Sequence, residues 1–437
     1  MKAKAMQESH RWRHRVALSV CACCVGTGLA APQIDITDFG QGADRAIRVK
    51  YEIGSDPVVV TVDFRTNDVS IGEANFRNLS GDVNRIVCGA GEHTILWERP
   101  HREWVGHVIN DQSFTAVVTA WATNAPPDYL AIDLDGTDAP RYYVSTNALP
   151  DPVESPVWRS TKLLMRRIHA KGETFLLGST PGEREEVRTI TGNSVGSGTD
   201  ESLHRVTFSD DFYIAVFEFT QGQYKTLYGS YNATSACKDK SDPDVYPLTR
   251  QTYNSVRGSY DDGVRWPQTG RGTVGGYMAA LRERTGGIGF DLPTEWQWEA
   301  ACKAGVQGLL YSGEEYSDEA YYRLSWVKGN SAVDGVDTLH PVGEKQPNSW
   351  GLYDMVGNAT ECMVNVYKSA QDDGPYVDPV GPECTSSSTH IRRGGRYSLN
   401  LRYNRPASRD TGLGGIGASS SSSEDGFRVI CPVGLYW

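Results

Sequence analysis

The segment Pro347–Cys362, with the sequence PNSWGLYDMVGNATEC, combines side chains that carry oxygen atoms with glycines that let the backbone turn. It shows neither a helical nor a strand period. Gly351 and Gly357 can adopt backbone angles closed to other residues, so the chain can fold back on itself there. The side chains that bear oxygen atoms are Asp354, Asn358 and Glu361. Because calcium binds carboxylate and carbonyl oxygens, the segment is a candidate cation site. The alternative is a metal-free surface loop made of turn residues.

The first 31 residues have the composition of a secretory signal peptide. Basic residues between Lys2 and Arg15 precede an apolar run, Val16–Leu29, and Ala30-Ala31 offers a cleavage site. The run is too short to span a bilayer permanently, and no later segment is apolar enough to do so. A lipoprotein signal ending at Cys23 is the alternative. We therefore expect an exported chain without a transmembrane segment after cleavage, located in the medium, the periplasm or at the cell surface.

The remaining sequence is acidic and has the composition of a soluble globular protein. The length of 437 residues predicts two to three domains, and 39% hydrophobic and 22% charged residues are ordinary for a soluble globular protein. The leader carries five basic residues and one acid, so its removal would shift the formal charge from −11 to −15. This charge argues against nucleic acid or anionic lipid as the main partner, because both need clustered Lys and Arg.

Six cysteines follow the leader, an even number in a chain expected to be exported. They are Cys88, Cys237, Cys302, Cys362, Cys384 and Cys431. No CxxC pair occurs among them, so a zinc site has little support. We expect one to three disulfides, whose connectivity cannot be read from the sequence. In a periplasm, some of these cysteines could equally be buried thiols.

A proline-rich stretch separates two regions that differ in their pattern of residue types. Residues 32–148 are predicted to form a small β-sandwich-like domain, because short runs rich in β-branched and aromatic residues alternate with turn residues. These predicted strands are Arg48–Ile53, Val58–Arg65, Thr115–Thr123, Tyr129–Leu134 and Tyr142–Thr146. Residues 149–158 contain three prolines and are predicted to be a linker.

Residues 159–437 are predicted to combine a few helices with long glycine-rich loops. Capping boxes at Thr220 with Gln223 and at Thr294 with Gln297 predict helices over Thr220–Gly229 and Glu295–Ala304. A third helix is predicted over Val274–Arg284. In the second helix, the side chains that recur at i, i+3 and i+4 predict one buried face: Trp298, Ala301 and Cys302.

These landmarks occur in the order found in the formylglycine-generating enzyme (sulfatase-modifying factor) family, which residues 159–437 resemble. The matching segments are Gly172–Ser179, His204–Phe208, Phe212–Ile214, Thr220–Tyr224, Leu292–Glu299, Pro347–Cys362, Arg393–Gly395 and Gly426–Arg428. The resemblance implies an α+β, C-type-lectin-like fold that is poor in regular structure and stabilised by calcium. It does not extend to the N-terminal β domain.

The resemblance also implies which residues would bind calcium. One family site falls on Asp354 and Glu361 through their side chains, and on Gly357 and Ala359 through their carbonyl oxygens. The family often has Asn where this chain has Asp354, and the change keeps an oxygen ligand while it adds charge. The family's other calcium site falls in Asn330–Thr338, which diverges here, so no residues are assigned to it.

The catalytic residues of the family do not carry over. Its oxidases hold copper with two cysteines after the Gly-Gly pair and oxidise a substrate cysteine to formylglycine; thiolates suit Cu(I). Leu399 and Asn404 stand at those positions, and Arg396 stands in place of a serine. Thr360 and Cys362 replace two tryptophans, and we expect Cys362 to be structural. Bound copper and cysteine oxidation are therefore not expected.

The first hypothesis is that the chain is a calcium-stabilised binding or scaffold module for an extracellular peptide or glycan. Its candidate ligand-binding residues are Arg396, Tyr397, Leu399 and Thr360. Arg and Tyr are favoured where a surface binds a partner. Arg393 and Arg428 are instead expected to be internal braces paired with acids such as Glu299.

Two alternatives stay open. One is an oxidoreductase or other enzyme with altered chemistry in the same pocket, of sulfatase-modifying or non-heme-iron type. The iron-dependent ergothioneine sulfoxide synthases of the superfamily take their ligands largely from histidines of a helical domain, whereas the N-terminal region here is predicted to be β. The other alternative is a structural part of a cell-surface assembly, with the β domain as the docking element.

Overall fold

The computed structural model describes residues 32–109, 113–194, 201–237, 239–258, 266, 276–368, 374–381, 389–410 and 422–434. The predicted signal peptide and Cys384 lie outside these ranges. Contacts divide the chain into two compact units. Unit 1 contains residues up to Ala131 together with Ala139–Val153, and unit 2 contains Ile132–Asp138 and Glu154–Trp437. The boundary at residues 153 and 154 lies within the stretch predicted to be a linker.

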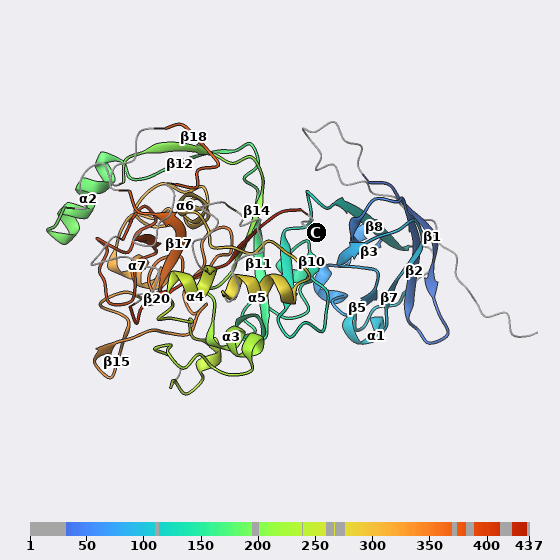
Figure 1. Ribbon diagram of the computed structural model, residues 1–437. Helices are drawn as coiled ribbons and strands as arrows, with labels where there is room; N and C mark the ends of the chain where they lie inside the picture. Colours follow the sequence, from blue (N-terminus) through green and yellow to red (C-terminus); the bar gives the residue numbers. More distant parts are fainter. Residues whose placement is uncertain are drawn as a thin grey trace, which may run out of the picture. The chain divides into compact units, whose positions relative to one another are not determined.

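Unit 1 is a β-sandwich, in agreement with the sequence. One sheet has the order β1-β2-β7-β5, from strands Ile34–Gln41, Ile47–Ile53, Gly91–Trp97 and Leu79–Gly81. The other has the order β4-β3-β6, from Val69–Ser70, Val58–Thr66 and Arg85–Val87, and β8 (Phe114–Ala122) also pairs with β3 (Figure 1). Short helical turns lie at η1 (Glu73–Asn75), α1 (Pro100–Glu103) and η2 (Thr146–Ala148).

The two sheets of unit 1 share one aromatic core. Phe64 of β3 stacks on Trp97 of β7, with ring centroids 5.0 Å apart, and on Phe114 of β8 at 5.8 Å. Sequence analysis found β2, β3, β8 and β9 (Tyr129–Asp133) within one or two residues; the predicted strand at Tyr142–Thr146 is the shorter β10 (Arg141–Tyr143). It missed β1 and β7, because their charged residues hide the alternation of buried positions.

Unit 2 contains several small sheets. An antiparallel sheet runs β11-β14-β21, from Lys162–Ile168, Phe212–Ala215 and Ile430–Pro432. A second has the order β12-β13-β18, from Thr174–Leu177, His204–Thr207 and Tyr376–Val377. A third has the order β19-β17-β20, from His390–Arg393, Thr360–Val366 and Asp425–Gly426. β15 (Ala332–Val333) and β16 (Val336–Asp337) form a hairpin.

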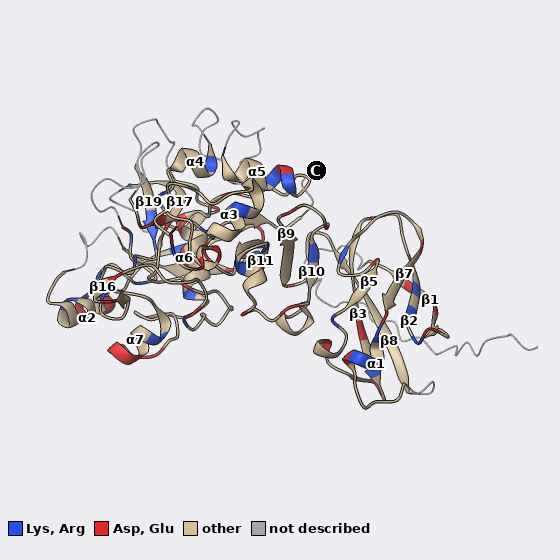
Figure 2. Ribbon diagram, turned by 90° about the horizontal axis from the view of Figure 1, so that it is seen from below, with Lys and Arg blue, Asp and Glu red and all other residues tan. Residues whose placement is uncertain are grey.

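The helices of unit 2 are short. They are α2 (Pro181–Thr191), α3 (Gln221–Tyr228), α4 (Tyr253–Arg257), α5 (Tyr277–Arg284), α6 (Glu295–Lys303) and α7 (Asp318–Leu324), with η3 (Pro156–Arg159) and η4 (Pro243–Val245). Acids at the start of α7 and arginines at the end of α5 complement the helix dipoles, as the charge colouring of Figure 2 shows. Among the described residues, no helix is long and apolar enough to cross a membrane.

Both capping boxes predicted from the sequence are present. The Thr220 hydroxyl accepts from the Gln223 amide at the start of α3, and Thr294 does the same with Gln297 at the start of α6. The helix α3 ends at Gly229 in the left-handed conformation, as expected. After α6, the C-cap residue Ala304 and the following Gly305 both have positive φ. Local hydrogen bonding therefore specified these starts accurately.

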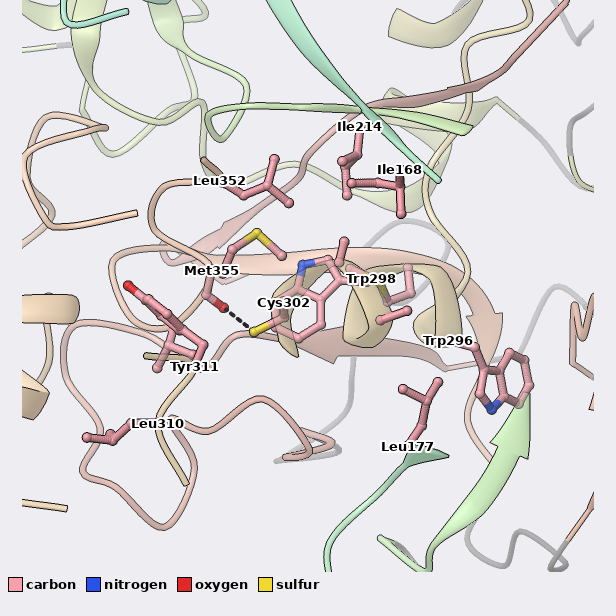
Figure 3. Close-up of a cluster of buried hydrophobic side chains, with 14 of the residues drawn as sticks. Ile168, Leu177, Ile214, Trp296, Trp298, Cys302, Leu310, Tyr311, Leu352 and Met355 are labelled. Carbon is pink, nitrogen blue, oxygen red and sulfur yellow. Dashed lines mark hydrogen bonds between the residues drawn. The ribbon is translucent and has the colours of Figure 1, made fainter. Parts of the chain in front are cut away.

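The helix α6 lies inside the hydrophobic core of unit 2. Trp298 and Cys302 point toward Leu352 and Met355 of the loop that follows residue 347, and the Cys302 thiol donates to the Met355 carbonyl oxygen over 3.7 Å (Figure 3). The sequence predicted one buried face, but all nine residues of α6 are buried. Its polar face is buried too, because ion pairs neutralise the charges there.

Candidate functional site

The loop at Pro347–Cys362 is a tightly folded segment, as its glycines suggested. Gly351, Asp354, Gly357 and Asn358 all have positive φ, between 53° and 86°. A Cβ atom at Gly357 would collide with the carbonyl oxygen of Trp326. The close approach of these two backbones therefore requires glycine at residue 357.

Asn358 closes this loop through both ends of its amide group. Its Oδ1 accepts from the His340 amide at 3.0 Å, and its Nδ2 donates to Oε2 of Glu218 at 2.7 Å. Glu218 also accepts from the Ala359 amide, at 2.9 Å. Glu218 was not predicted as a site residue, although an acid inside the apolar run Phe212–Phe219 was an available signal.

Asp354 has a carboxylate oxygen without a partner. The residue is 2% exposed; its Oδ2 accepts from the Gly343 amide at 2.6 Å, whereas its buried Oδ1 has no hydrogen-bond partner. Burial raises the pKa of Asp354 to about 6. Burial, and then the charges of Asp354 and Glu361, raise the pKa of Glu218 well above its ordinary value. Burial therefore disfavours the charged forms of these two carboxyl groups, and a positive charge placed next to them would favour those forms.

Glu361 belongs to the same group of acids but already has partners. Its Oε1 accepts from Nη2 of Arg428 at 2.8 Å, and its Oε2 accepts from Trp298 Nε1 at 2.7 Å. Both Glu361 and Arg428 are almost fully buried. The predicted brace at Arg428 is therefore present, with Glu361 as its acid. Three buried carboxylates, Glu218, Asp354 and Glu361, interact with this single guanidinium.

These contacts bear on whether the loop can bind a cation. The unpartnered Oδ1 of Asp354 and the excess of carboxylates over guanidinium both favour an added positive charge. In the described parts of the chain, no three His, Cys, Asp or Glu side chains are placed to hold a metal ion by themselves. The backbone carbonyls of Gly357 and Ala359 would therefore have to supply ligands, as the family resemblance implies. The Oδ1 of Asp354 is the carboxylate oxygen that a calcium ion could use without displacing a hydrogen-bond partner.

A second loop, Arg393–Asn404, is held together by Asn404. The family resemblance aligns this residue with one of the copper-binding cysteines. Asn404 is fully buried; its Oδ1 accepts from the Arg396 amide at 2.6 Å. Its Nδ2 donates to the carbonyl oxygens of Arg396, at 3.0 Å, and Leu399, at 2.6 Å. An amide that donates and accepts thus holds the loop. This role was not predicted, because the family resemblance indicated only that Asn404 cannot supply a thiolate.

The four candidate ligand-binding residues differ in exposure. The Arg396 side chain is 22% exposed and pairs with Asp410 and Glu424. Tyr397 and Leu399 are partly exposed. Thr360 is fully buried, and its hydroxyl donates to the Arg393 carbonyl oxygen at 3.2 Å. The structure therefore brings Arg396, Tyr397 and Leu399 to a partly exposed surface and places Thr360 beneath it.

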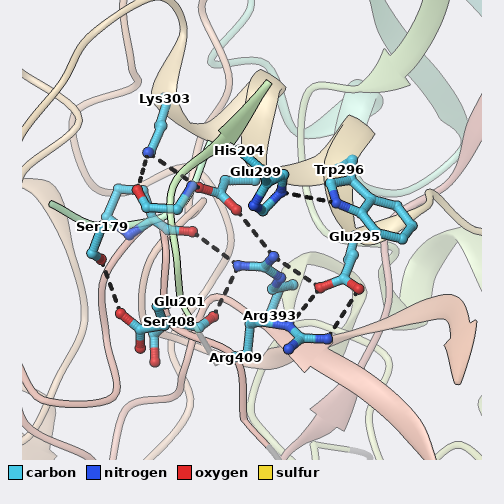
Figure 4. A network of polar contacts seen from close by, with 12 residues as sticks. Ser179, Glu201, His204, Glu295, Trp296, Glu299, Lys303, Arg393, Ser408 and Arg409 are labelled. Carbon is cyan, nitrogen blue, oxygen red and sulfur yellow. Dashed lines mark hydrogen bonds and ion pairs between the residues drawn. The ribbon is translucent and has the colours of Figure 1, made fainter. Parts of the chain in front are cut away.

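Arg393 is the internal brace expected from the sequence. It lies between two carboxylates of α6, and its Nη2 donates to Glu295 and to Glu299, both at 3.0 Å (Figure 4). Burial disfavours the charge of Glu299, but Lys303 and Arg393 lower its pKa to about 2. Arg409 pairs with Glu295 from the other side. The network joins α6 to the second loop.

The expectation of disulfides is not met among the cysteines that the structure describes. Cys88 is an exposed free thiol. The others are buried free thiols: Cys237, Cys302, Cys362 and Cys431. Burial raises the pKa of Cys362, which suits an inert structural thiol.

Comparison with known proteins places this geometry in a family. Residues 170–432 match the sulfatase-modifying factor enzyme 1-like domain. The formylglycine-generating enzyme of Mus musculus is 30% identical over 151 residues, which are 32% of this chain and 38% of that protein. The enzyme of Streptomyces coelicolor is 33% identical over 150 residues, 32% and 46% of the two chains. The chain thus spans less than half the length of either relative.

Two further similarities were found. The inactive C-alpha-formylglycine-generating enzyme 2 of Bos taurus is 36% identical over 89 residues, 20% of this chain and 30% of that protein. The solved structure of PvdO from Pseudomonas aeruginosa has a TM-score of 0.46 and 23% identity, and the match covers 62% of this chain and 94% of that one. With the family match spanning most of the sequence, the chain belongs to the sulfatase-modifying factor enzyme 1-like domain family.

Proposed function

We propose that this protein is an exported, calcium-stabilised binding or scaffold module that does not perform the copper-dependent cysteine oxidation of its enzymatic relatives. The observation that carries the proposal is the chemistry of the two residues that stand in place of the copper-binding cysteines in the second loop. Leu399 and Asn404 offer no thiolate, and the Asn404 amide is fully used in holding the backbone of Arg396 and Leu399. The similarity to inactive relatives supports the same conclusion.

The surface proposed to bind a ligand, here called the loop face, consists of Arg396, Tyr397, Leu399 and the neighbouring hairpin β15–β16. The hairpin lies beside the loop because the Ser331 hydroxyl donates to the Tyr397 carbonyl oxygen at 3.0 Å. Val333 and Val336 of the hairpin are 51% and 67% exposed. A face that combines tyrosine, arginine and exposed aliphatic groups suits an extracellular peptide or glycan.

Calcium is proposed as the structural ion of the first loop. Asp354 and Glu361 would contribute carboxylate oxygens, and Gly357 and Ala359 would contribute carbonyl oxygens. A divalent cation there would compensate the excess charge of the three buried carboxylates, which Arg428 alone does not balance. The ion would fix the backbone of the loop and supply no redox chemistry.

The first experiment tests whether the protein binds copper and oxidises a substrate cysteine. The protein without residues 1–31 is titrated with Cu(I) and incubated with a cysteine-containing sulfatase peptide, alongside an active formylglycine-generating enzyme. We expect no stoichiometric Cu(I) binding and no aldehyde. Tight Cu(I) binding with aldehyde formation would refute the proposal in favour of an oxidase.

A binding screen tests the positive half of the proposal. The same protein is screened against extracellular glycans and peptides, including sulfated ones, with Tyr397→Ala and Arg396→Ala as loop-face variants. We expect at least one class to bind and both variants to weaken it. The exposed change Glu315→Gln, outside the loop face, is the control. Absence of binding to every class, or binding unaffected by both loop-face variants, would count against a module that uses this face.

A further inference from the structure

A separate cavity of about 170 Å³ opens within unit 2. Five parts of the fold line it: the turn before β14, Trp266, the start of α6, the segment after β18 and the end of β21. The lining residues include Phe208, Asp210, Trp266, Gln297, Asp378 and Pro432. None of them belongs to the loops at Pro347–Cys362 or Arg393–Asn404. The cavity is therefore distinct from both parts of the site described above.

The walls of the cavity are partly apolar and its charged groups are acidic. Phe208, Trp266, Pro379 and Pro432 supply the apolar lining, and no lysine or arginine is among the described residues that line it. Asp210 and Asp378 supply two carboxylates. Such a combination attracts a cation, because an aromatic face and a carboxylate both stabilise positive charge.

The carboxylate of Asp378 is held in place. Its Oδ1 accepts from the Ser209 amide at 2.8 Å, and its own amide donates to the Thr207 carbonyl oxygen at 3.0 Å. These bonds tie the segment after β18 to the turn that carries Asp210. Asp210 itself is 69% exposed at its side chain and pairs with the exposed Lys171 at 3.4 Å, a contact that water screens and a ligand can replace.

We infer that this cavity binds the basic side chain of an arginine or lysine from a polypeptide partner. Its volume lies below the roughly 300–1,000 Å³ of sites for drug-sized ligands, so a single side chain suits it. The aliphatic stem of that side chain would pack on the prolines and Phe208, and its cationic end would lie between Trp266 and the two carboxylates. The net charge of −11 on the chain favours approach of a basic partner.

A polypeptide suits the place of the cavity in the fold. Asp378 directly follows β18, which among the described residues is the last strand in the order β12-β13-β18. An extended peptide that pairs along a strand at the edge of a sheet gains main-chain hydrogen bonds, and side-chain pockets beside that edge give specificity. This inference does not depend on the function proposed for the loop face.

The test is calorimetric titration of the protein without residues 1–31 with a short neutral peptide that contains one arginine. The matched peptide carries citrulline, which keeps the shape and removes the charge. We expect the arginine peptide to bind about tenfold more tightly than the citrulline peptide, and to weaken as salt is raised. Equal affinity for the two peptides would overturn the inference.

Variants then locate the binding. Asp378→Asn keeps the acceptor for Ser209 and removes the charge, and Asp210→Asn changes an exposed residue, so neither should disturb the fold. We expect Asp378→Asn and Trp266→Ala each to weaken the arginine peptide threefold to thirtyfold, roughly what one ion pair or cation–π contact contributes. Glu315→Gln should change nothing. Binding unaffected by all three cavity variants, or a glycan that binds through Trp266 while the peptide does not, would refute the inference.

Discussion

Tyr397 donates its backbone N–H to the carbonyl oxygen of Asn358 over 2.9 Å, and this bond joins the proposed calcium loop to the proposed loop face. A parallel link runs from the Gly357 amide to the Gly394 carbonyl oxygen at 2.8 Å. Because the two loops share backbone hydrogen bonds, a change in the shape of one must be transmitted to the other. Loss of an ion from the first loop would therefore disturb Tyr397 as well.

Calcium removal provides the first prediction. We expect the melting temperature to fall by several degrees when a chelator is added to the calcium-loaded protein, because a ligand bound by the folded state alone raises its stability. Asp354→Ala should abolish the difference between calcium and chelator, whereas Asp378→Asn, remote from the loop, should preserve it. An unchanged melting temperature for the unaltered protein would remove the calcium assignment.

Gly357 is predicted to tolerate no side chain. Gly357→Ala introduces positive φ for alanine and a collision with Trp326, so we expect a loss of about 2–4 kcal/mol in the free energy of unfolding. Gly229→Ala is the matched control, because its φ is also positive but no atom lies within 4 Å of the added Cβ. That variant should lose only about 1 kcal/mol. Equal losses in urea denaturation would contradict the proposed close approach.

The two neighbouring arginines of the second loop should differ strongly in their effect on stability. Arg393→Met leaves Glu295 and Glu299 partly uncompensated inside the protein, so we expect a loss of about 3–5 kcal/mol. Arg396→Met changes a partly exposed ion pair and should alter stability by about 1 kcal/mol or less. Urea denaturation of the two variants measures the difference, and a reversed order would show that Arg393 is not a brace.

Protonation of Glu299 should lower the stability of the folded protein in acid. Its pKa is about 2 in the folded protein and 4.5 ordinarily, so the folded state binds the proton less readily. The stability from its charge is full above pH 4.5 and is lost as the pH falls toward 2, by about 3 kcal/mol in total. Glu299→Gln should have lower stability at pH 7 and a shallower decline between these pH values. Parallel declines for the two proteins would contradict the low pKa.

Asn404 should organise the second loop more than it stabilises the whole unit. Asn404→Ala removes three hydrogen bonds and leaves the Arg396 amide without its acceptor, so we expect a loss of about 1–3 kcal/mol. Backbone amide exchange at Arg396 and Tyr397 should accelerate, while exchange in α6 should stay nearly unchanged relative to the loss of global stability. Uniform acceleration across unit 2 would argue against a local role.

Sequence reasoning succeeded where interactions are local. The capping boxes at Thr220 and Thr294 were predictable because the side chain and amide that bond each other are three residues apart. The order of the family landmarks gave the fold class and the residues of the first loop. The brace at Arg393 was predicted as well, because a buried arginine needs an acid and α6 offered one.

The parts that sequence could not give depend on distant segments. Glu218 reaches Asn358 from far along the chain, and the apolar run around Glu218 indicates that it is buried but not which residue it pairs with. The burial of the charged face of α6 depends on Arg393 and Arg409, which come from another region. The cavity beside Asp378 forms only where residues from five parts of the chain meet. Tertiary packing decides these features, and no local pattern records it.

The strands β20 and β21 bear on the order in which unit 2 can fold. Ile430 pairs with Ile214 of β14, and Gly426 pairs with Glu361 of β17, so the end of the unit completes sheets that begin much earlier. Closing such long loops is entropically unfavourable until the final contacts form. During synthesis, unit 2 therefore cannot complete these two sheets until residues 426–432 have left the ribosome.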